Sequence, residues 1–376
     1  MKEKNTQRLK TPQGTESVFL EDAYRHKQLV RMTEDHFGSW GYLPVMTPVF
    51  DYFETYRPLL DRDQIEYSYR FPDRDGELLL LRSDITLFLA KQIGISLNSK
   101  ALPKRLYYAD SIIRHQEEED ISSDEYFQSG AELIGLNDIN ADLEVLMLLH
   151  DLLKSIDIAE WRLHIGSVEI IDAICMNNVR PGEIGEFLES RNTAELIDFL
   201  ESRNIPAPEV SAELLMFMGT IEDFNNFIPE ILNKLSVDSK NLSTVKDALG
   251  KLRNLLEELS INADTDKIIV DLSEHGGQPY YTGFTVKAYA EGANSAIASG
   301  GRYDNLLGYF GTETPAAGFS LLMRKIEQIS SFAPEYSRSE NTVYIKGENF
   351  SEKYRKALSE INKGKRIILS GTDKNE

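Results

Sequence analysis

The sequence predicts an α+β fold in which an antiparallel sheet is flanked by helices. Strand-like runs follow one another across short turns, as on both sides of Asp73-Arg74-Asp75-Gly76, which is a hairpin signal. Long stretches with helical patterning stand apart from these runs, as at residues 21–37 and 141–156. Hairpin-connected strands with helices packed on the sheet are typical of α+β domains.

The first half of the chain alternates helices with short strands. Residues 21–37 lack Pro and Gly and predict a helix that Gly38 and Gly41 end. Residues 42–56 follow, and the prolines inside this run indicate an edge or interface strand. The hairpin over residues 68–84 comes next, and "ITLFLAKQIG" predicts a helix that ends at Gly94.

The central part predicts a long hairpin and then a helical insertion. Residues 104–115 and 125–135 read as antiparallel strands joined by an acidic loop, and a helix over 141–156 and a strand over 161–167 follow. From about residue 168 to 261 the pattern is helical, in short pieces that Pro181, Pro206, Pro208 and Pro229 cut.

Strand patterns return after the insertion. They cover "KIIVDL", "YYTGFTVKAYAEG" and "SAIASGGRYDNLL", and "AGFSLLMRKIEQI" predicts a helix. A polar linker over 331–340 separates this core, residues 1–330, from a strand–helix–strand tail over 341–376. One βαβ unit cannot cover both faces of its own sheet, so the tail is expected to be a truncated domain or to pack on a partner.

The composition bounds the function. With 376 residues, 41% of them hydrophobic, the chain is long enough for two to three globular domains. Its formal net charge of −20 argues against a broad nucleic-acid surface, although a local basic patch is compatible with it. The N-terminal residues lack an apolar segment and no apolar run approaches the roughly 18–20 residues of a membrane span, so neither a signal peptide nor a membrane helix is expected.

Cysteine and histidine usage bounds the chemistry further. The lone Cys175 excludes a disulfide framework and favours a reducing, cytoplasmic location. The six histidines are scattered without a pair at ligand spacing, so no metal site is expected. The chain carries neither a phosphate-binding P-loop nor a dinucleotide fingerprint, and we expect no cofactor.

Five segments in order resemble the class II histidyl-tRNA synthetases over about residues 8–330, and the tail matches their anticodon-binding domain weakly. "GYLPVMTPVFDYFETY" resembles class II motif 1, "LRSDIT" a substrate-binding signature, and "KRLYYADSIIRHQEEEDISSDEYFQSGAELIG" motif 2. "PYYTGFTVKAYAEG" resembles the family's tyrosine-rich signature, and "SGGRYDNLLGYFG" leads into motif 3. The resemblance implies a class II synthetase-like core with a helical insertion and a truncated remnant at the C-terminus.

The resemblance implies that the amino-acid pocket is retained. By position, Asp84 and Thr86 would hold the α-ammonium of free histidine, and Arg114 its carboxylate. The pocket lining would comprise Gln128, Glu132, Tyr280 and Tyr281.

Each of these residues also has an alternative, purely structural interpretation. Arg114 could serve a buried ion pair, and Gln128 and Glu132 could be ordinary polar strand residues. Tyr280 and Tyr281, if adjacent on one strand, point to opposite faces, so that one of them belongs to the core.

The resemblance also implies that the nucleotide-binding and catalytic positions are lost. Motif 2 arginines are replaced by Glu117, Ser122 and Asp124, its loop glycine by Ile121, and the glutamate tied to adenine by Gln116. Gly276 stands where the family has a catalytic arginine. Motif 3 places Lys325 at its arginine, Arg324 at its glutamate and Leu322 at a glycine, unless the register shifts by one and Arg324 takes the arginine's place.

The loop of motif 2 is acidic. Six carboxylates and no cation lie between His115 and Tyr126, and they oppose the binding of phosphates. The loop is then either a solvated hairpin tip or a docking surface.

Synthetase-like chains without this machinery resemble the regulatory subunits of ATP phosphoribosyltransferase. The resemblance implies a non-catalytic subunit that dimerises, binds histidine but no tRNA, and assembles with the short catalytic subunit. It would activate the first step of histidine biosynthesis and contribute to feedback inhibition. Two alternatives remain at this point: a histidine-activating enzyme with an altered nucleotide site, and a stand-alone histidine sensor.

Overall fold

The computed structural model describes residues 12, 14–96, 102–115, 124–176, 178–179, 181–235, 239–332, 342–346 and 349–369. The chain divides into two compact units. The first comprises Met1–Val18 and Leu29–Ser331, and the second comprises Phe19–Gln28 and Phe332–Glu376. Among the described residues, no helix combines the length and apolar character needed to cross a bilayer.

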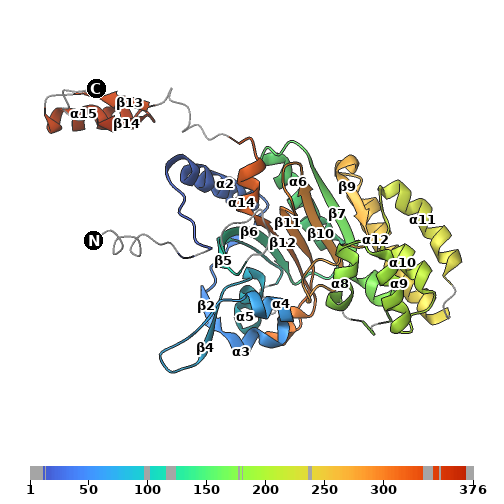
Figure 1. Cartoon of the computed structure of the whole chain (residues 1–376). Helices are drawn as coiled ribbons and strands as arrows, with labels where there is room; N and C mark the ends of the chain where they lie inside the picture. Colours follow the sequence, from blue (N-terminus) through green and yellow to red (C-terminus); the bar gives the residue numbers. More distant parts are fainter. Residues whose placement is uncertain are drawn as a thin grey trace, which may run out of the picture. The chain divides into compact units, whose positions relative to one another are not determined.

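The first unit is built on a nine-stranded sheet within the described part of the chain (Figure 1). Neighbouring strands are antiparallel except at two positions, β1 beside β5 and β7 beside β9. This arrangement confirms the α+β prediction. Across the sheet the strands are β1 (Leu43–Pro44), β5 (Lys104–Ile113), β6 (Glu125–Ile134), β12 (Ala316–Leu322), β11 (Ala298–Arg302), β10 (Phe284–Ala290), β7 (Trp161–Ser167), β9 (Ile268–Asp271) and β8 (Met218–Gly219).

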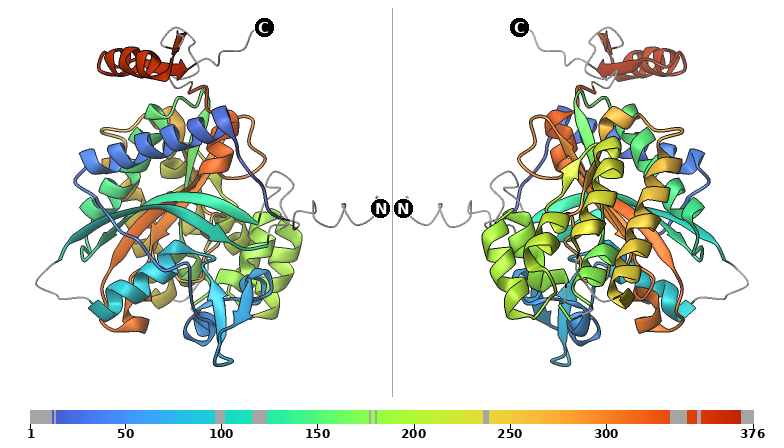
Figure 2. Two further views of the ribbon diagram at one scale, coloured as in Figure 1. Left: turned by 90° about the vertical axis from the view of Figure 1, so that its left-hand side faces the viewer. Right: turned by 90° about the vertical axis from the view of Figure 1, so that its right-hand side faces the viewer.

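Helices cover both faces of this sheet. The alternating directions of the side chains along β5 distinguish the two faces. The side chain of Arg105 meets Glu144 of α6 (Ile139–Ser155) at 2.6 Å. Its neighbour Leu106 points the other way and packs in the cluster that α5 (Ile85–Ser96) completes. Helix α6 and the long α12 (Ser239–Leu259) therefore lie on one face and α5 on the opposite face (Figure 2).

A small second sheet precedes α5. It pairs β2 (Phe50–Tyr52), β4 (Leu78–Leu81) and β3 (Arg70–Pro72), and the predicted hairpin joins β3 to β4. Both β1 and β2 are edge strands, as Pro44 and Pro48 within residues 42–56 indicate. The single strand predicted over residues 42–56 is wrong: only β1 and β2 are strands, they belong to different sheets, and Phe53–Tyr56 form helix α3 with Phe53 and Tyr56 buried.

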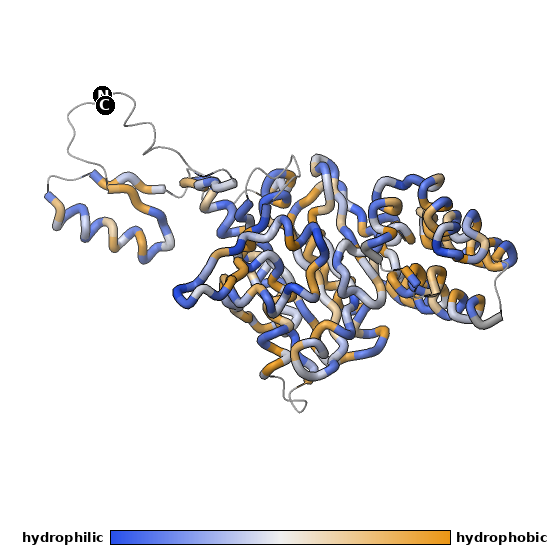
Figure 3. The backbone as a smooth tube through the Cα atoms, turned by 60° about the horizontal axis from the view of Figure 1, so that its bottom comes forward, coloured by the Kyte–Doolittle hydropathy of each residue, from blue (hydrophilic) through white to orange (hydrophobic). Residues whose placement is uncertain are grey.

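The predicted insertion is helical. It comprises α7 (Val168–Ile174), α8 (Pro181–Glu189), α9 (Thr193–Ser202), α10 (Pro208–Leu215), α11 (Ile221–Lys234) and α12. Hydrophilic and hydrophobic stretches alternate along these helices (Figure 3), as expected for helices that bury one face. Pro229 does not cut a helix as predicted but lies inside α11, and Met218–Gly219 form β8 at the edge of the main sheet.

Two further predictions are wrong in part. Residues 316–322 form strand β12 and only Met323–Ile329 form helix α14, because the apolar run fits a buried strand between β6 and β11 equally well. Helix α5 does not end at Gly94 but continues to Ser96. Gly94 serves packing instead, since a Cβ there would lie 2.8 Å from Cβ of Phe310 in α13 (Leu306–Phe310).

The second unit contains the predicted strand–helix–strand arrangement. Strands β13 (Thr342–Ile345) and β14 (Arg366–Leu369) are parallel, and α15 (Phe350–Ile361) connects them. Ala357 of α15 is buried, whereas Phe350, Tyr354 and Leu358 expose apolar side chains at helical spacing.

Replacement by alanine is expected to have opposite effects on stability at the two helical glycines Gly94 and Gly250. Gly94→Ala places a methyl group against Phe310 and should lower the free energy of unfolding by roughly 1–3 kcal/mol. Gly250 of α12 has no atom within 4 Å of the added Cβ, so Gly250→Ala should raise that free energy by about 0.5–1 kcal/mol. Denaturant unfolding measures both, and a stabilised Gly94→Ala would contradict the α5–α13 packing.

A candidate ligand pocket and its neighbouring cleft

The seven side chains that the sequence singled out line one cavity of about 70 Å³. The cavity lies on the α5 side of the sheet, at the middle of β6. Its lining comprises the predicted Asp84, Thr86, Arg114, Gln128, Glu132, Tyr280 and Tyr281, together with Gln278, Ser299, Tyr303, Gly318, Phe319, Ser320 and Leu322.

The start of α5 supplies two of the polar groups. Asp84 precedes the helix, and its Oδ1 accepts a hydrogen bond from the backbone N–H of Leu87 at 2.9 Å, as an N-cap does. Its Oδ2 accepts a hydrogen bond from the Tyr280 hydroxyl at 3.2 Å. Burial raises the pKa of Asp84, against the opposing effects of the Leu87 N–H and the Arg114 charge.

Glu132 lies at the floor of the cavity and is 1% exposed. The Thr86 hydroxyl donates to its Oε1 at 2.7 Å and the Tyr303 hydroxyl to its Oε2 at 2.5 Å. Gly318 faces it across the β6–β12 pair, where any Cβ would overlap Oε2. Burial raises the pKa of Glu132 to about 8, although both hydroxyl hydrogen bonds lower it.

Both tyrosines of the predicted pair line the cavity. The expectation that they sit on one strand and face opposite ways is wrong, because Tyr280 and Tyr281 lie in the turn before β10 with ring centroids 5.2 Å apart. The prediction missed Tyr303, whose ring stands edge-on to that of Tyr280 at 5.7 Å. The "GGRYD" segment, which contains Tyr303, was the available signal.

Two polar side chains of the cavity are uncommitted. Among the described residues, neither the guanidinium of Arg114 nor the amide of Gln128 has a hydrogen-bond or ion-pair partner, although Gln128 is 9% exposed. Arg114 only lies over the Tyr126 ring, 5.6 Å from its centroid. Within the described part of the chain, the structure thus shows no ion pair for Arg114. A buried amide and a free guanidinium are groups that a polar, anionic ligand would satisfy.

The pocket opens into a second cavity of about 790 Å³. Arg114, Gln278, Ser299 and Leu322 belong to the linings of both. The larger cleft runs along the ends of β7, β9 and β10 and reaches α8 of the insertion. Arg114 thus stands at the boundary between a small enclosed site and a wide open one.

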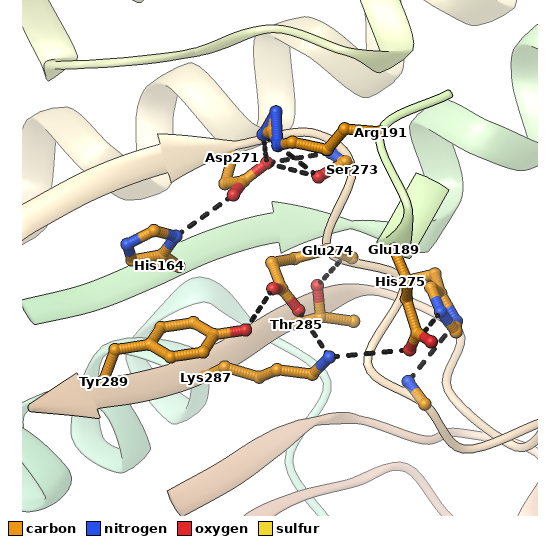
Figure 4. A network of polar contacts seen from close by, with 11 residues as sticks. His164, Glu189, Arg191, Asp271, Ser273, Glu274, His275, Thr285, Lys287 and Tyr289 are labelled. Carbon is orange, nitrogen blue, oxygen red and sulfur yellow. Dashed lines mark hydrogen bonds and ion pairs between the residues drawn. The ribbon is translucent and has the colours of Figure 1, made fainter. Parts of the chain in front are cut away.

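Two cations of the cleft, Arg191 and Lys287, are held in ion pairs (Figure 4). Arg191 lies 2.9 Å from Asp271, and Lys287 lies 3.0 Å from Glu274. Burial would raise the pKa of Asp271, but hydrogen bonds from His164 and Ser273 and the charge of Arg191 hold it at about 2. These cations already have carboxylate partners, so they are not available to a polyphosphate.

One group in the cleft has the ligand types of a metal site. Single ligand atoms of His164, Asp271 and Glu274 lie within 4.8 Å of one another. However, Asp271 Oδ2 is 3.0 Å from Nδ1 of His164, as in a direct hydrogen bond, and Arg191 and Lys287 balance the two carboxylates. The geometry is that of an ion-pair network (Figure 4).

The positions of the lost catalytic machinery also line the cleft. Gly276 has φ +84°, and a Cβ there would lie 2.4 Å from Cδ2 of Tyr281, so the backbone leaves no room for an arginine. Lys325 lines the cleft and donates to Ser295, whereas Arg324 pairs with Glu16 at 2.7 Å. A shift of register that brings Arg324 into the cleft is therefore wrong. Of the motif 2 substitutions, Gln116, Glu117, Ile121 and Ser122 lie outside the described residues.

Comparison with known proteins identifies the family of this chain. A family model described as histidyl-tRNA synthetase matches residues 14–326. The ATP phosphoribosyltransferase regulatory subunit of Caldanaerobacter subterraneus is 30% identical over 323 residues, which cover 84% of this chain and 81% of that one. The chain belongs to the ATP phosphoribosyltransferase regulatory subunits.

Solved structures agree with this family. A regulatory subunit/histidyl-tRNA synthetase from Bacillus halodurans superposes with a TM-score of 0.80 at 25% identity, covering 97% of this chain and 94% of that chain. A histidyl-tRNA synthetase from Nostoc reaches a TM-score of 0.75 at 18% identity, with 98% and 86% covered, and it shows the shared fold. The regulatory-subunit family is therefore built on the class II synthetase core, as the sequence predicted.

Burial of Glu132 in the empty pocket is expected to lower the free energy of unfolding of the chain. Its pKa is about 8 when folded, against about 4.5 when unfolded, so the folded chain binds more protons between these values and stability falls as pH rises from about 4.5 to 8. The free energy of unfolding of Glu132→Gln should therefore exceed that of the wild type. The difference should grow between pH 5 and pH 8 and reach roughly 2–4 kcal/mol.

Denaturant unfolding at several pH values measures this margin. Glu186→Gln changes an exposed carboxylate of α8 in the same way and should follow the wild-type curve. Parallel curves for Glu132→Gln and the wild type would contradict the burial of an ionisable Glu132.

Proposed function

We propose that this chain is a non-catalytic regulatory subunit that activates the short catalytic subunit of ATP phosphoribosyltransferase in the first step of histidine biosynthesis. It also contributes to feedback inhibition by histidine. One observation carries the proposal: a small pocket keeps the uncommitted Arg114 and Gln128, while Arg191 and Lys287 of the adjoining cleft are held in ion pairs. The lone buried thiol of Cys175 is in keeping with a cytoplasmic complex.

Free histidine matches the pocket group by group. Its α-ammonium pairs with Asp84 and its carboxylate with Arg114 at the cleft side of the pocket. Its imidazole lies between the tyrosine rings, and Glu132 and Gln128 satisfy the ring nitrogens. Each charged end of the amino acid then has a partner of opposite charge.

Adenylation of histidine and transfer to tRNA do not fit the cleft. A transition state that spreads charge over phosphates requires preorganised cations. Here Arg191 and Lys287 are bound to carboxylates, and Gly276 stands where the synthetases have an arginine. The proposed subunit therefore binds the amino acid without activating it and has no tRNA substrate.

Inhibition requires that the pocket and the catalytic partner be coupled. A ligand shifts a conformational equilibrium only by its differential affinity for the two states, and the coupling is reciprocal. Histidine in the pocket should thus stabilise a conformation of the complex in which the catalytic subunit is less active.

The chain is also proposed to form a dimer with a second copy through the segment around β1 and β2. Leu43, Met46 and Phe50 are exposed there by 67%, 90% and 53%. Neighbouring large apolar side chains on an edge strand are typical of a surface that another protein covers.

Reconstitution with the short catalytic subunit tests the function. The complex should form phosphoribosyl-ATP faster than the catalytic subunit alone and should be inhibited by histidine. Asp84→Asn keeps an N-cap for α5 but removes the charge that meets the ammonium. It should assemble normally and need about 10–100-fold more histidine for half-inhibition.

Asp138→Asn is the matched control, because Asp138 caps α6 outside the pocket. A catalytic subunit that is equally active and equally inhibited alone would refute the function. Unchanged inhibition in Asp84→Asn would refute only the site. Histidine-dependent ATP–pyrophosphate exchange above background would instead favour a working synthetase.

The dimer has a separate test. Met46→Glu should shift the chain toward the monomer, because a carboxylate cannot be buried in an apolar interface without a partner. Ile261→Glu alters another exposed apolar residue, just after α12, and should leave the mass unchanged. Sedimentation equilibrium measures both, and a Met46→Glu protein with wild-type mass would contradict this interface.

A further inference from the structure

The carboxyl group of Glu132 is enclosed on every side without a cation in hydrogen-bonding contact. Its described hydrogen-bond donors are two neutral hydroxyls, those of Thr86 and Tyr303. The cavity's single cation, Arg114, makes no ion pair with it. From β12 only Gly318 faces it. The other titratable groups that interact with it are Asp84 before α5, Tyr42 before β1, Tyr108 of β5, Tyr280 and Tyr281 before β10, and Tyr303 after β11.

These neighbours offer no positive charge, and one of them, Asp84, adds a negative one. A carboxylate in such surroundings loses hydration without gaining a counter-ion, so its protonated form is favoured in the empty pocket. Burial accordingly raises the pKa of Glu132 to about 8, so that the group is mainly protonated at pH 7.

We propose that the pocket binds histidine together with one proton that Glu132 and the imidazole ring share. This rests on the proposed function, in which histidine occupies the pocket. At neutral pH the empty protein supplies that proton: Glu132 transfers it to a ring nitrogen, so the carboxyl becomes a carboxylate and the ring an imidazolium. The buried acid then acquires the cation that the protein itself does not provide.

The shared proton fixes how binding depends on pH. Free imidazole titrates near pH 6.5, so between about 6.5 and 8 protonated Glu132 meets a neutral ring and no proton is exchanged with solvent. Above about pH 8 the complex must take up a proton, and Kd should rise about tenfold per unit. Below about pH 6.5 an imidazolium meets protonated Glu132, a proton is released, and Kd should rise again.

Calorimetric titration of L-histidine into the full-length protein tests this dependence. The wild type should show a flat minimum of Kd between pH 6.5 and 8 and a rise of roughly tenfold from pH 8 to 9. Titrations in two buffers of different ionisation enthalpy should give almost no proton uptake at pH 7.2 and close to one proton at pH 9.

Glu132→Gln removes the shared proton but keeps the shape. Apart from the titration of the ligand's ammonium, which is common to both proteins and cancels in their comparison, the Kd of this variant should stay flat from pH 7 to 9. If this variant does not bind or fold, the two-buffer measurement on the wild type decides alone.

The outcomes separate the two proposals. A wild-type affinity that increases from pH 7 to 8.5 with proton release would show an ionised Glu132 beside a neutral ring and would overturn this inference. A pH-independent affinity would overturn it as well. Histidine that fails to bind at any pH would overturn the proposed function instead.

Discussion

The contact of Glu132 with Gly318 is the constraint on which the pocket depends. The two residues are direct partners across β6 and β12, and only a glycine leaves room for the carboxyl group to lie over the neighbouring strand. From that position Glu132 accepts hydrogen bonds from Thr86, at the start of α5, and from Tyr303, beyond β11. One buried acid therefore joins a helix and three strands around a cavity. Its burial costs stability, which is common for groups kept for function.

A class II synthetase core here combines a retained site with a lost one. Among the described residues, the Arg114 guanidinium in the pocket has no hydrogen-bond or ion-pair partner, and Asp84 lines the same cavity. In the adjoining cleft, Arg191, Lys287 and the carboxylates around them neutralise one another. Under the proposed function, the same fold binds an amino acid but offers no arrangement of free cations for phosphates. This difference is what a regulatory subunit with a histidine ligand requires.

The sequence could predict much of this arrangement. Periodicity and turn residues located most elements, because hairpins and amphipathic helices are local patterns. All seven side chains that the resemblance to synthetases supplied line the pocket, and seven further lining residues were not among them. The strand at residues 316–322 could not be separated from a helix by its apolar run, since only its place between two strands decides its conformation. Tyr303 and Gly318 matter through distant contacts with Glu132, which no local pattern reveals.

The central claim is that an unoccupied arginine and a buried acid hold free histidine without its activation. Equilibrium titration of histidine into the isolated chain, with and without saturating ATP and Mg²⁺, tests it most directly. The account predicts one site per chain, a Kd that ATP leaves unchanged, and a loss of roughly 10–100-fold in Arg114→Leu, which leaves the carboxylate unpaired. Binding that depends on ATP, or that Arg114→Leu retains in full, would contradict it.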